Sequence, residues 1–267
     1  MKIATYNVWN DTGNIDVRTA HLIREINNVD ADIIGLQEVL PDFWDNLIKH
    51  TDYKYHVFRM FRHRSDGLAI LSKYPFESEF FLYDSEEFQN SLALNITFKT
   101  NEMIFSVTNV HLPWDSILIK EKQIVAVNEY ISRQNNVDYP FLLGDFNCSY
   151  HSSIHNFLSG EQSLLNREVG SGNDIWCDLA EIHAALNGYD VMPTLDFTNN
   201  PRFKDSHPKK YIPVAYDRIY LMDKKTDNKQ KLEYKIENVR IFGTDISPET
   251  GLSPSDHYGL LAEVDFY

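Results

Sequence analysis

Phe141-Leu142-Leu143-Gly144-Asp145-Phe146-Asn147 is the stretch around which the chain is organised. A short apolar run stops at Gly144, and a carboxylate and a carboxamide follow two residues apart. We interpret the run as a buried strand and the glycine as the tight turn that ends it. Asp145 and Asn147 would then face one point just beyond the strand. Because Asp and Asn side chains also bond to their own backbone in ordinary turns, the pattern gains meaning only from other polar strand ends.

The composition is that of a globular protein. The chain has 267 residues, of which 43% are hydrophobic and 24% charged, enough for a large core without staples. No Gly/Ser-rich or Pro-rich linker divides the sequence, so we expect a single domain over residues 1–267. Cys148 and Cys177 are the only cysteines, which excludes a disulfide framework and a cysteine-based zinc site.

Neither targeting nor membrane insertion is predicted. The run Met1–Asn7 is strand-like and lacks the long apolar segment of a signal peptide. No apolar stretch reaches the ~18 residues of a membrane span, so we expect a cytoplasmic protein. The formal net charge of −14 argues against tight non-specific binding to long nucleic acids, because proteins that neutralise many phosphates are usually basic.

Helix-like and strand-like segments mix along the chain. Apolar residues at helical spacing predict helices over residues 16–29, from Pro41 onward, 115–134, near 151–158 and 178–187. Asp16 and Asp115 are candidate caps for two of them. Other apolar runs predict strands over residues 2–9, 32–39, 53–61, 67–72, 76–83, 92–98, 103–111, from Phe141, 214–222, 234–242 and 259–266. Residues 193–213 are a predicted loop. Hairpins beside crossover helices favour two packed sheets with helices outside.

Five further strand ends or turns carry polar residues. They are Tyr6-Asn7, Gln37-Glu38, Asn109-Val110-His111, Asp217-Arg218-Ile219 and Ser255-Asp256-His257. Each one alone is explained as a turn or a satisfied hydrogen bond. Six such places in one chain are hard to explain separately, because a buried polar group without a partner costs several kcal/mol. Convergence on one pocket would give all of them partners.

The residue types at these places suggest phosphate chemistry. Glu38 is a hard oxygen ligand of the kind that Mg²⁺ prefers. Asp145 is suited to orient or deprotonate a water molecule. His257 is suited to stabilise charge on a phosphoryl oxygen, with Asp217 holding the imidazole ring and its tautomer.

Other chemistries have weaker support. The sequence contains neither the Gly-x-Ser-x-Gly of a serine hydrolase nor a P-loop. His151 and His155 have the helical i, i+4 spacing of some zinc sites, but no Glu stands beside the first histidine.

Taken together, the six motifs resemble the endonuclease/exonuclease/phosphatase superfamily, the fold of DNase I and of exonuclease III-type nucleases. The resemblance runs from Thr5 to Gly259. It implies an α/β (α+β) four-layer sandwich of two facing mixed β-sheets flanked by helices. It also implies Mg²⁺, for which Mn²⁺ can substitute, bound by Glu38 with help from Asn7 and Asp256.

The same resemblance implies catalytic roles for five residues. Asp145 and Asn147 would position the attacking water. His257, paired with Asp217, would stabilise the pentacovalent phosphorus, and His111 would bond a phosphate oxygen.

Within the superfamily the chain is most similar to the tyrosyl-DNA phosphodiesterase 2-like group. Residues 193–200 resemble that group's Thr-Trp-Asp-Thr segment and its following Asn, which implies substrate-binding roles for Asp196 and Asn200. The aromatic of that segment is Leu195 here, Phe146 and Cys148-Ser149 stand where the group tends to have Thr and a Leu-Arg pair, and Pro113-Trp114 replaces Glu-Ser. Two of these departures remove groups expected to touch DNA.

Two basic stretches interrupt the acidic chain. One contains Arg62 and Arg64, and the other contains Lys209 and Lys210. They are either solvated surface or rim loops that attract a phosphorylated substrate. Trp114 offers a face for a base or ring, or else packs in an interface or the core.

Three functions remain open at this point. The leading one is a Mg²⁺-dependent phosphodiesterase acting on a DNA-end or nucleotide-like substrate. The second is a phosphoesterase for a small molecule, such as an inositol phosphate or a phospholipid head group. The third is a non-catalytic binding protein on the same fold, which is disfavoured because every expected catalytic position is filled. No obligate protein partner is inferred.

Overall fold

The computed structural model of the chain describes residues 1–13, 15–82, 93–168, 175–204, 212–223 and 233–267. Lys209 and Lys210 lie outside the described residues. The strands are β1 Lys2–Asn7, β2 Ile33–Val39, β3 Tyr55–Met60, β4 Gly67–Ser72, β5 Phe76–Leu82, β6 Ala93–Thr100, β7 Met103–His111, β8 Tyr139–Asp145, β9 Ile175–Asp178, β10 Asp217–Asp223, β11 Tyr234–Phe242 and β12 Gly259–Phe266. The helices are α1 Ile15–Val29, α2 Pro41–Leu47, α3 Ile117–Ser132, α4 Ser153–Leu158, α5 Leu179–Asn187 and the short 3₁₀ helix η2 Pro201–Phe203. Among these, no helix is long and apolar enough to cross a membrane.

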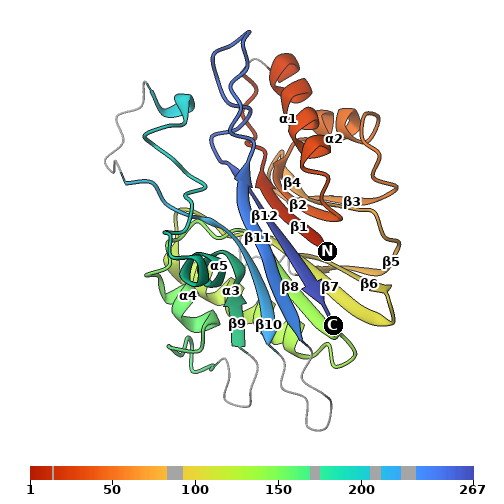
Figure 1. Ribbon diagram of the computed structural model, residues 1–267, viewed down its shortest axis with the longest axis vertical. Helices are drawn as coiled ribbons and strands as arrows, with labels where there is room; N and C mark the ends of the chain where they lie inside the picture. Colours follow the sequence, from red (N-terminus) through yellow and green to blue (C-terminus); the bar gives the residue numbers. More distant parts are fainter. Residues whose placement is uncertain (14, 83–92, 169–174, 205–211, 224–232) are drawn as a thin grey trace.

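The strands form two mixed six-stranded sheets that pack face to face (Figure 1). The first sheet has the order β11-β12-β1-β2-β4-β3, and the second has the order β5-β6-β7-β8-β10-β9. Within them β1 pairs with β2 and β7 with β8 in parallel, and the other pairings are antiparallel. The parallel pairs are joined through helices α1 and α3, as parallel strands require a crossover.

Three apolar layers hold the sandwich together. The central layer lies between the sheets and includes Ile3, Phe141 and Leu143. Helices α1 and α2 cover the outer face of the first sheet, and α3 and α4 cover the outer face of the second (Figure 1). The predicted four-layer arrangement is therefore confirmed.

Strand alternation brings the polar strand ends to one edge of the central layer. Side chains two apart share a face. Ile3 faces the second sheet, so Asn7 at the end of β1 does too. Phe141 faces the first sheet, so Asp145 at the end of β8 does too. Val107 of β7 and Ile219 of β10 also lie in this layer. The same alternation therefore places His111, at the end of β7, and Asp217, at the start of β10, on the layer as well.

Some local predictions were wrong. The cap of α3 is Ser116, whose Oγ accepts from the Ile119 N–H at 3.3 Å, rather than Asp115. The helix also starts at Ile117, later than expected, and Ile117 is 54% exposed in its first turn. Helix α1 begins at Ile15, so Asp16 lies within the first turn rather than at the cap.

Candidate active site

The Asp145 carboxylate is the centre of the polar cluster. Its Oδ2 accepts from Asn7 Nδ2 at 3.0 Å and from Asn147 Nδ2 at 3.3 Å. The same oxygen lies 3.6 Å from His111 Nε2 and 3.9 Å from His257 Nε2. Strand pairing sets this geometry, because His111 is the register partner of Asp145. Asn7, His111 and His257 come from three distant parts of the chain and thus converge, together with Asn147, on one carboxylate oxygen.

Glu38 reaches the cluster because β2 is irregular at its end. The pairing of β2 with β4 shifts register between Leu36 and Val39, and Glu38 has a left-handed φ of 58°. This conformation is uncommon outside glycine and is held by surrounding contacts at functional sites. Glu38 Oε1 accepts from Asn7 Nδ2 at 3.1 Å, and Oε2 accepts from the Asn10 N–H at 2.9 Å.

His257 is held by a carboxylate on a neighbouring strand. Its Nδ1 lies 2.8 Å from Asp217 Oδ2, and both side chains are buried. Asp217 is the cross-strand partner of Asp145 in the β8–β10 ladder. Thr194 fixes both parts of the pair: its Oγ1 accepts from the Asp217 N–H at 3.0 Å and its carbonyl accepts from the Tyr258 N–H at 2.7 Å.

The cluster carries more negative charge than its imidazoles balance. Burial raises the pKa of Asp145, with His257 opposing that shift. Burial, with Glu38 and Asp145 nearby, raises the pKa of Asp256 to about 6. Burial acts on Glu38 in the same direction, but His111 and the two hydrogen bonds to its oxygens outweigh it and lower the pKa of Glu38. Burial opposes a charge on His257, yet Asp217 and Asp145 raise the pKa of His257 well above its ordinary value.

Two buried cationic side chains lie behind the site and were not predicted from the sequence. Lys120 of α3 donates from Nζ to the carbonyl of Asn147 at 2.6 Å. Arg18 of α1 donates from Nη1 to the carbonyls of Val8 and Trp9, each at 2.8 Å, in the loop that follows β1. A signal for both exists in the sequence, because each lies four residues before an apolar residue of its helix's buried stripe: Lys120 before Ile124, and Arg18 before Leu22.

The predicted substrate-binding residues are spread more widely. Asp196 is buried and accepts from the N–H groups of Thr198 and Asn199, each at 2.9 Å. Asn200 is buried too, and its Nδ2 donates to the carbonyl of Asp256 at 3.0 Å. These two residues therefore brace the loops around His257. Arg64 makes a two-pronged ion pair with Asp66, with both contacts at 2.8 Å. Arg62 and Trp114 are exposed.

Two groups of side chains have spacings that suit a metal. Asp145, Asp217 and His257 have ligand atoms within 4.8 Å of one another, as do His155, Asp178 and Glu181. The second group already holds a cation, because Arg218 Nη1 donates to Asp178 Oδ2 at 2.6 Å. The zinc alternative through His151 and His155 fails, since α4 begins at Ser153 and the two histidines do not share a helix.

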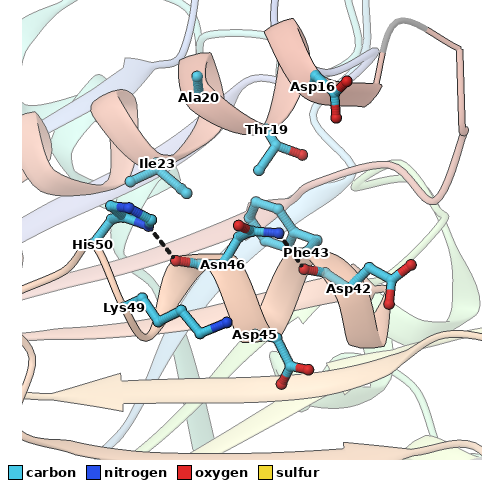
Figure 2. Close-up of a pocket in the computed structure, with 10 residues that line it drawn as sticks. All are labelled: Asp16, Thr19, Ala20, Ile23, Asp42, Phe43, Asp45, Asn46, Lys49 and His50. Carbon is cyan, nitrogen blue, oxygen red and sulfur yellow. Dashed lines mark hydrogen bonds between the residues drawn. The ribbon is translucent and has the colours of Figure 1, made fainter.

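One surface pocket lies away from the polar cluster. A groove of about 730 Å³ runs between α1 and α2 (Figure 2). Exposed Asp16, Asp42 and Asp45 line it, together with Lys49 and with His50, whose Nδ1 is 2.8 Å from the carbonyl of Asn46. It belongs to the packing of two helices on the outer face of the first sheet, and no residue of the polar cluster lines it.

Comparisons with known proteins identify the family and agree with the fold. The family model for the "Endonuclease/Exonuclease/phosphatase family" matches residues 4–257. No curated protein sequence is significantly similar to the chain. TDP2 from D. rerio, solved with a single-strand DNA product, superposes with a TM-score of 0.76 at 18% identity over 99% of this chain and 98% of that one. The mannosyl-6-phosphatase Bt3783 of Bacteroides thetaiotaomicron VPI-5482 gives 0.71 at 17% identity over 100% of both chains. A functionally unknown conserved protein from Enterococcus faecalis V583 gives 0.71 at 23% identity, also over 100% of both.

The solved structures share the fold, and the family match covers nearly the whole chain. The match also confirms the prediction of a hydrolase that acts on phosphoester bonds. Sequence motifs, sheet topology and the convergence on Asp145 thus lead to one assignment. The chain belongs to the endonuclease/exonuclease/phosphatase family.

Proposed function

We propose that this protein is a Mg²⁺-dependent phosphodiesterase that acts on a DNA-end or nucleotide-like phosphodiester. The observation that carries the proposal is the convergence of Asn7, Asn147, His111 and His257 on Asp145 Oδ2, at 3.0 to 3.9 Å. In-line water attack on phosphorus needs a proton acceptor beside donors for the phosphoryl oxygens, and this cluster holds both kinds of group.

Asp145 is the water-positioning carboxylate in this proposal. Its pKa is raised by burial, which makes it a better proton acceptor than an exposed carboxylate. Asn147 donates from its backbone N–H to Asp145 Oδ1 at 2.8 Å and from its side-chain amide to Asp145 Oδ2. Both oxygens of the Asp145 carboxylate are therefore fixed in orientation. The water would be held on this carboxylate and would lose its proton to it.

His257 and His111 are the donors to the phosphoryl oxygens. The raised pKa of His257, caused by Asp217 against the effect of burial, favours the imidazolium. Its Nε2 then carries a proton toward the cluster while Nδ1 donates to Asp217. Charge that develops on the phosphoryl oxygens would be stabilised by groups already oriented, without reorganisation during the reaction.

The residues present suit a hard divalent cation. Glu38, Asp145 and Asp256 interact as like charges, and the raised pKa of Asp256, due to burial and these neighbours, shows that repulsion. A cation such as Mg²⁺ prefers carboxylate oxygen and needs only one or two protein carboxylates. Glu38 with Asp256 would hold it. In this structure Asn7 turns its amide nitrogen toward Glu38 and so orients the ligand. When bound, the ion would polarise a phosphoryl oxygen.

A direct test uses chromogenic esters of three kinds. We would assay a p-nitrophenyl ester of thymidine 5′-phosphate, a short oligonucleotide with the same ester at its 5′ end, and p-nitrophenyl phosphate, each with Mg²⁺ and with EDTA. The proposal expects turnover of the nucleotide esters that requires the metal and is lost in Asp145→Asn. Turnover in EDTA equal to that in Mg²⁺, or none of either nucleotide ester, would overturn it.

A small phosphorylated molecule is the second candidate substrate. The structural neighbour named as a mannosyl-6-phosphatase covers the full length of both chains. The net charge of −14 also disfavours a long polyanion. Mannose 6-phosphate and an inositol phosphate, assayed by phosphate release, form the comparison arm. A higher kcat/KM for either than for the nucleotide esters would favour this candidate.

A further inference from the structure

We propose that Lys120 is a positioning residue for catalysis: from helix α3 its ammonium holds the backbone of Asn147 so that the Asn147 amide stays on Asp145. This inference rests on the proposed function, because it assigns Lys120 to the same site. Lys120 would touch neither substrate nor reacting atoms. It would act through the turn that follows β8.

The geometry that carries the inference is a short contact at a strained residue. Lys120 Nζ donates to the Asn147 carbonyl at 2.6 Å. Asn147 has a left-handed φ of 48°, a conformation that needs support from its surroundings in any residue other than glycine. The Asn147 amide donates in turn to the Leu112 carbonyl at 3.0 Å and to Asp145 Oδ2 at 3.3 Å. One ammonium thus fixes the backbone that aims the amide.

Stability alone does not explain the buried position of Lys120. The residue is only 6% exposed, on the helix face that carries Ile124 and Ile131 into the core. Burial lowers the pKa of Lys120, since the surroundings disfavour its charge, and the carboxylates nearby, Asp145 and Asp115, only partly oppose that shift. An apolar side chain of similar length would avoid this desolvation cost. Because the buried ammonium of Lys120 carries this desolvation cost, we infer that its role lies in the site.

Activity and stability should therefore respond in opposite ways. For Lys120→Met we expect kcat to fall by about 10–100-fold, the usual effect of removing a group that orients a reacting residue. The melting temperature should stay the same or rise, and KM and the Mg²⁺ concentration for half activation should stay near wild type, because Glu38 is not involved. Lys120→Arg keeps a donor on the carbonyl and should recover most of the lost kcat.

A second readout does not depend on activity. The Asn147 N–H donates to Asp145 Oδ1, so its protection against hydrogen exchange reports on the order of the turn. In Lys120→Met, exchange in the peptide around Asn147 should become faster while peptides from β12 stay unchanged. Lys122→Met is the matched control, since it removes the same charge from the same helix two residues away. It should change neither exchange at Asn147 nor kcat.

The outcomes separate this inference from the proposed function. Wild-type kcat in Lys120→Met, or unchanged exchange at Asn147, would overturn the inference. A loss of kcat that follows a drop in melting temperature, without recovery in Lys120→Arg, would make Lys120 merely structural and would also overturn it. If the wild type hydrolyses no phosphoester, the proposed function fails, and the exchange experiment alone decides whether Lys120 holds the turn. Should Lys120→Met not fold, Lys120→Gln, which is neutral but polar, takes its place in both measurements.

Discussion

His257 Nδ1 and Asp217 Oδ2 lie 2.8 Å apart, although 40 residues separate them in the chain. Both side chains are buried at the edge of the layer between the sheets. The carboxylate fixes the imidazole ring, leaves Nε2 directed at the cluster and favours the protonated ring. The pair is therefore a single functional unit, and this can be measured.

The first prediction concerns that unit. His257→Ala should lower kcat by about 10²–10⁴-fold, the range for positioned acid–base and oxyanion-stabilising groups. Asp217→Asn should lose part of that factor. In the double variant the losses should be much smaller than the product of the single losses, because Asp217 acts through His257. Independent, multiplicative losses in steady-state kinetics would show that the two residues are not coupled.

The second prediction is a pH dependence of activity and stability. Against the effect of burial, Asp217 and Asp145 raise the pKa of His257. The stabilisation from this pair is complete below the ordinary imidazole pKa and is lost as the pH rises through the raised folded-state value. The alkaline limb of kcat should follow the same ionisation. In Asp217→Asn the limb should move to lower pH, because one source of the raised pKa is gone. A limb that does not move would assign it to another group.

The third prediction is that Asp256 destabilises the metal-free protein at neutral pH. The pKa of Asp256 is raised to about 6 by burial, Glu38 and Asp145, so its contribution to stability is fully present only below about 3.8 and is lost as the pH rises through 6. Asp256→Asn should be more stable than wild type in EDTA at neutral pH, by at most about 3 kcal/mol. The difference should shrink as the pH is lowered. Denaturant melts at several pH values test this, and equal stability at neutral pH would contradict it.

The fourth prediction concerns the metal. Glu38→Gln keeps the shape of the side chain and removes the charge that attracts the ion. Activity should fall by about two orders of magnitude or more, and the rise in melting temperature on adding Mg²⁺ should disappear, since binding to the folded state is what stabilises it. Glu237→Gln, an exposed carboxylate on β11, is the control. Full activity of Glu38→Gln in EDTA would end the metal hypothesis.

The fifth prediction is about substrate size. The charge of −14 repels long polyanions, and Arg64 is already paired with Asp66. Long duplex DNA should bind weakly at physiological salt, with a shallow salt slope that reflects few neutralised phosphates. Lys209→Glu combined with Lys210→Glu should raise KM more than it lowers kcat, because these side chains would attract substrate without touching phosphorus. Tight duplex binding with a steep salt slope would instead favour an interior endonuclease.

The sequence by itself determined the layers of the fold and the edge at which the chemistry lies. Alternation along β1 and β8 assigns Asn7 to the face of Ile3 and Asp145 to the face of Phe141. Those faces follow from the two-residue period of a β-strand, which is visible in the sequence. The prediction that Gly144 forms the turn ending this strand was wrong, because Gly144 lies inside β8, paired with Val110 on one side and Arg218 on the other. Local periodicity is why the sandwich and most of the cluster were predictable.

Only the tertiary structure decided how Glu38 reaches the cluster and what stands behind it. Ile33 of β2 faces the layer between the sheets, so strand alternation alone would direct Glu38, five residues later, to the opposite face. A register shift against β4 and a left-handed φ at Glu38 turn its side chain inward instead. Lys120 interrupts an apolar stripe, but the sequence does not say that its partner is the carbonyl of Asn147. Both depend on contacts between segments far apart in the chain. An irregular backbone or a buried charge is stabilised by those distant partners, and the local sequence pattern does not predict which residues they are.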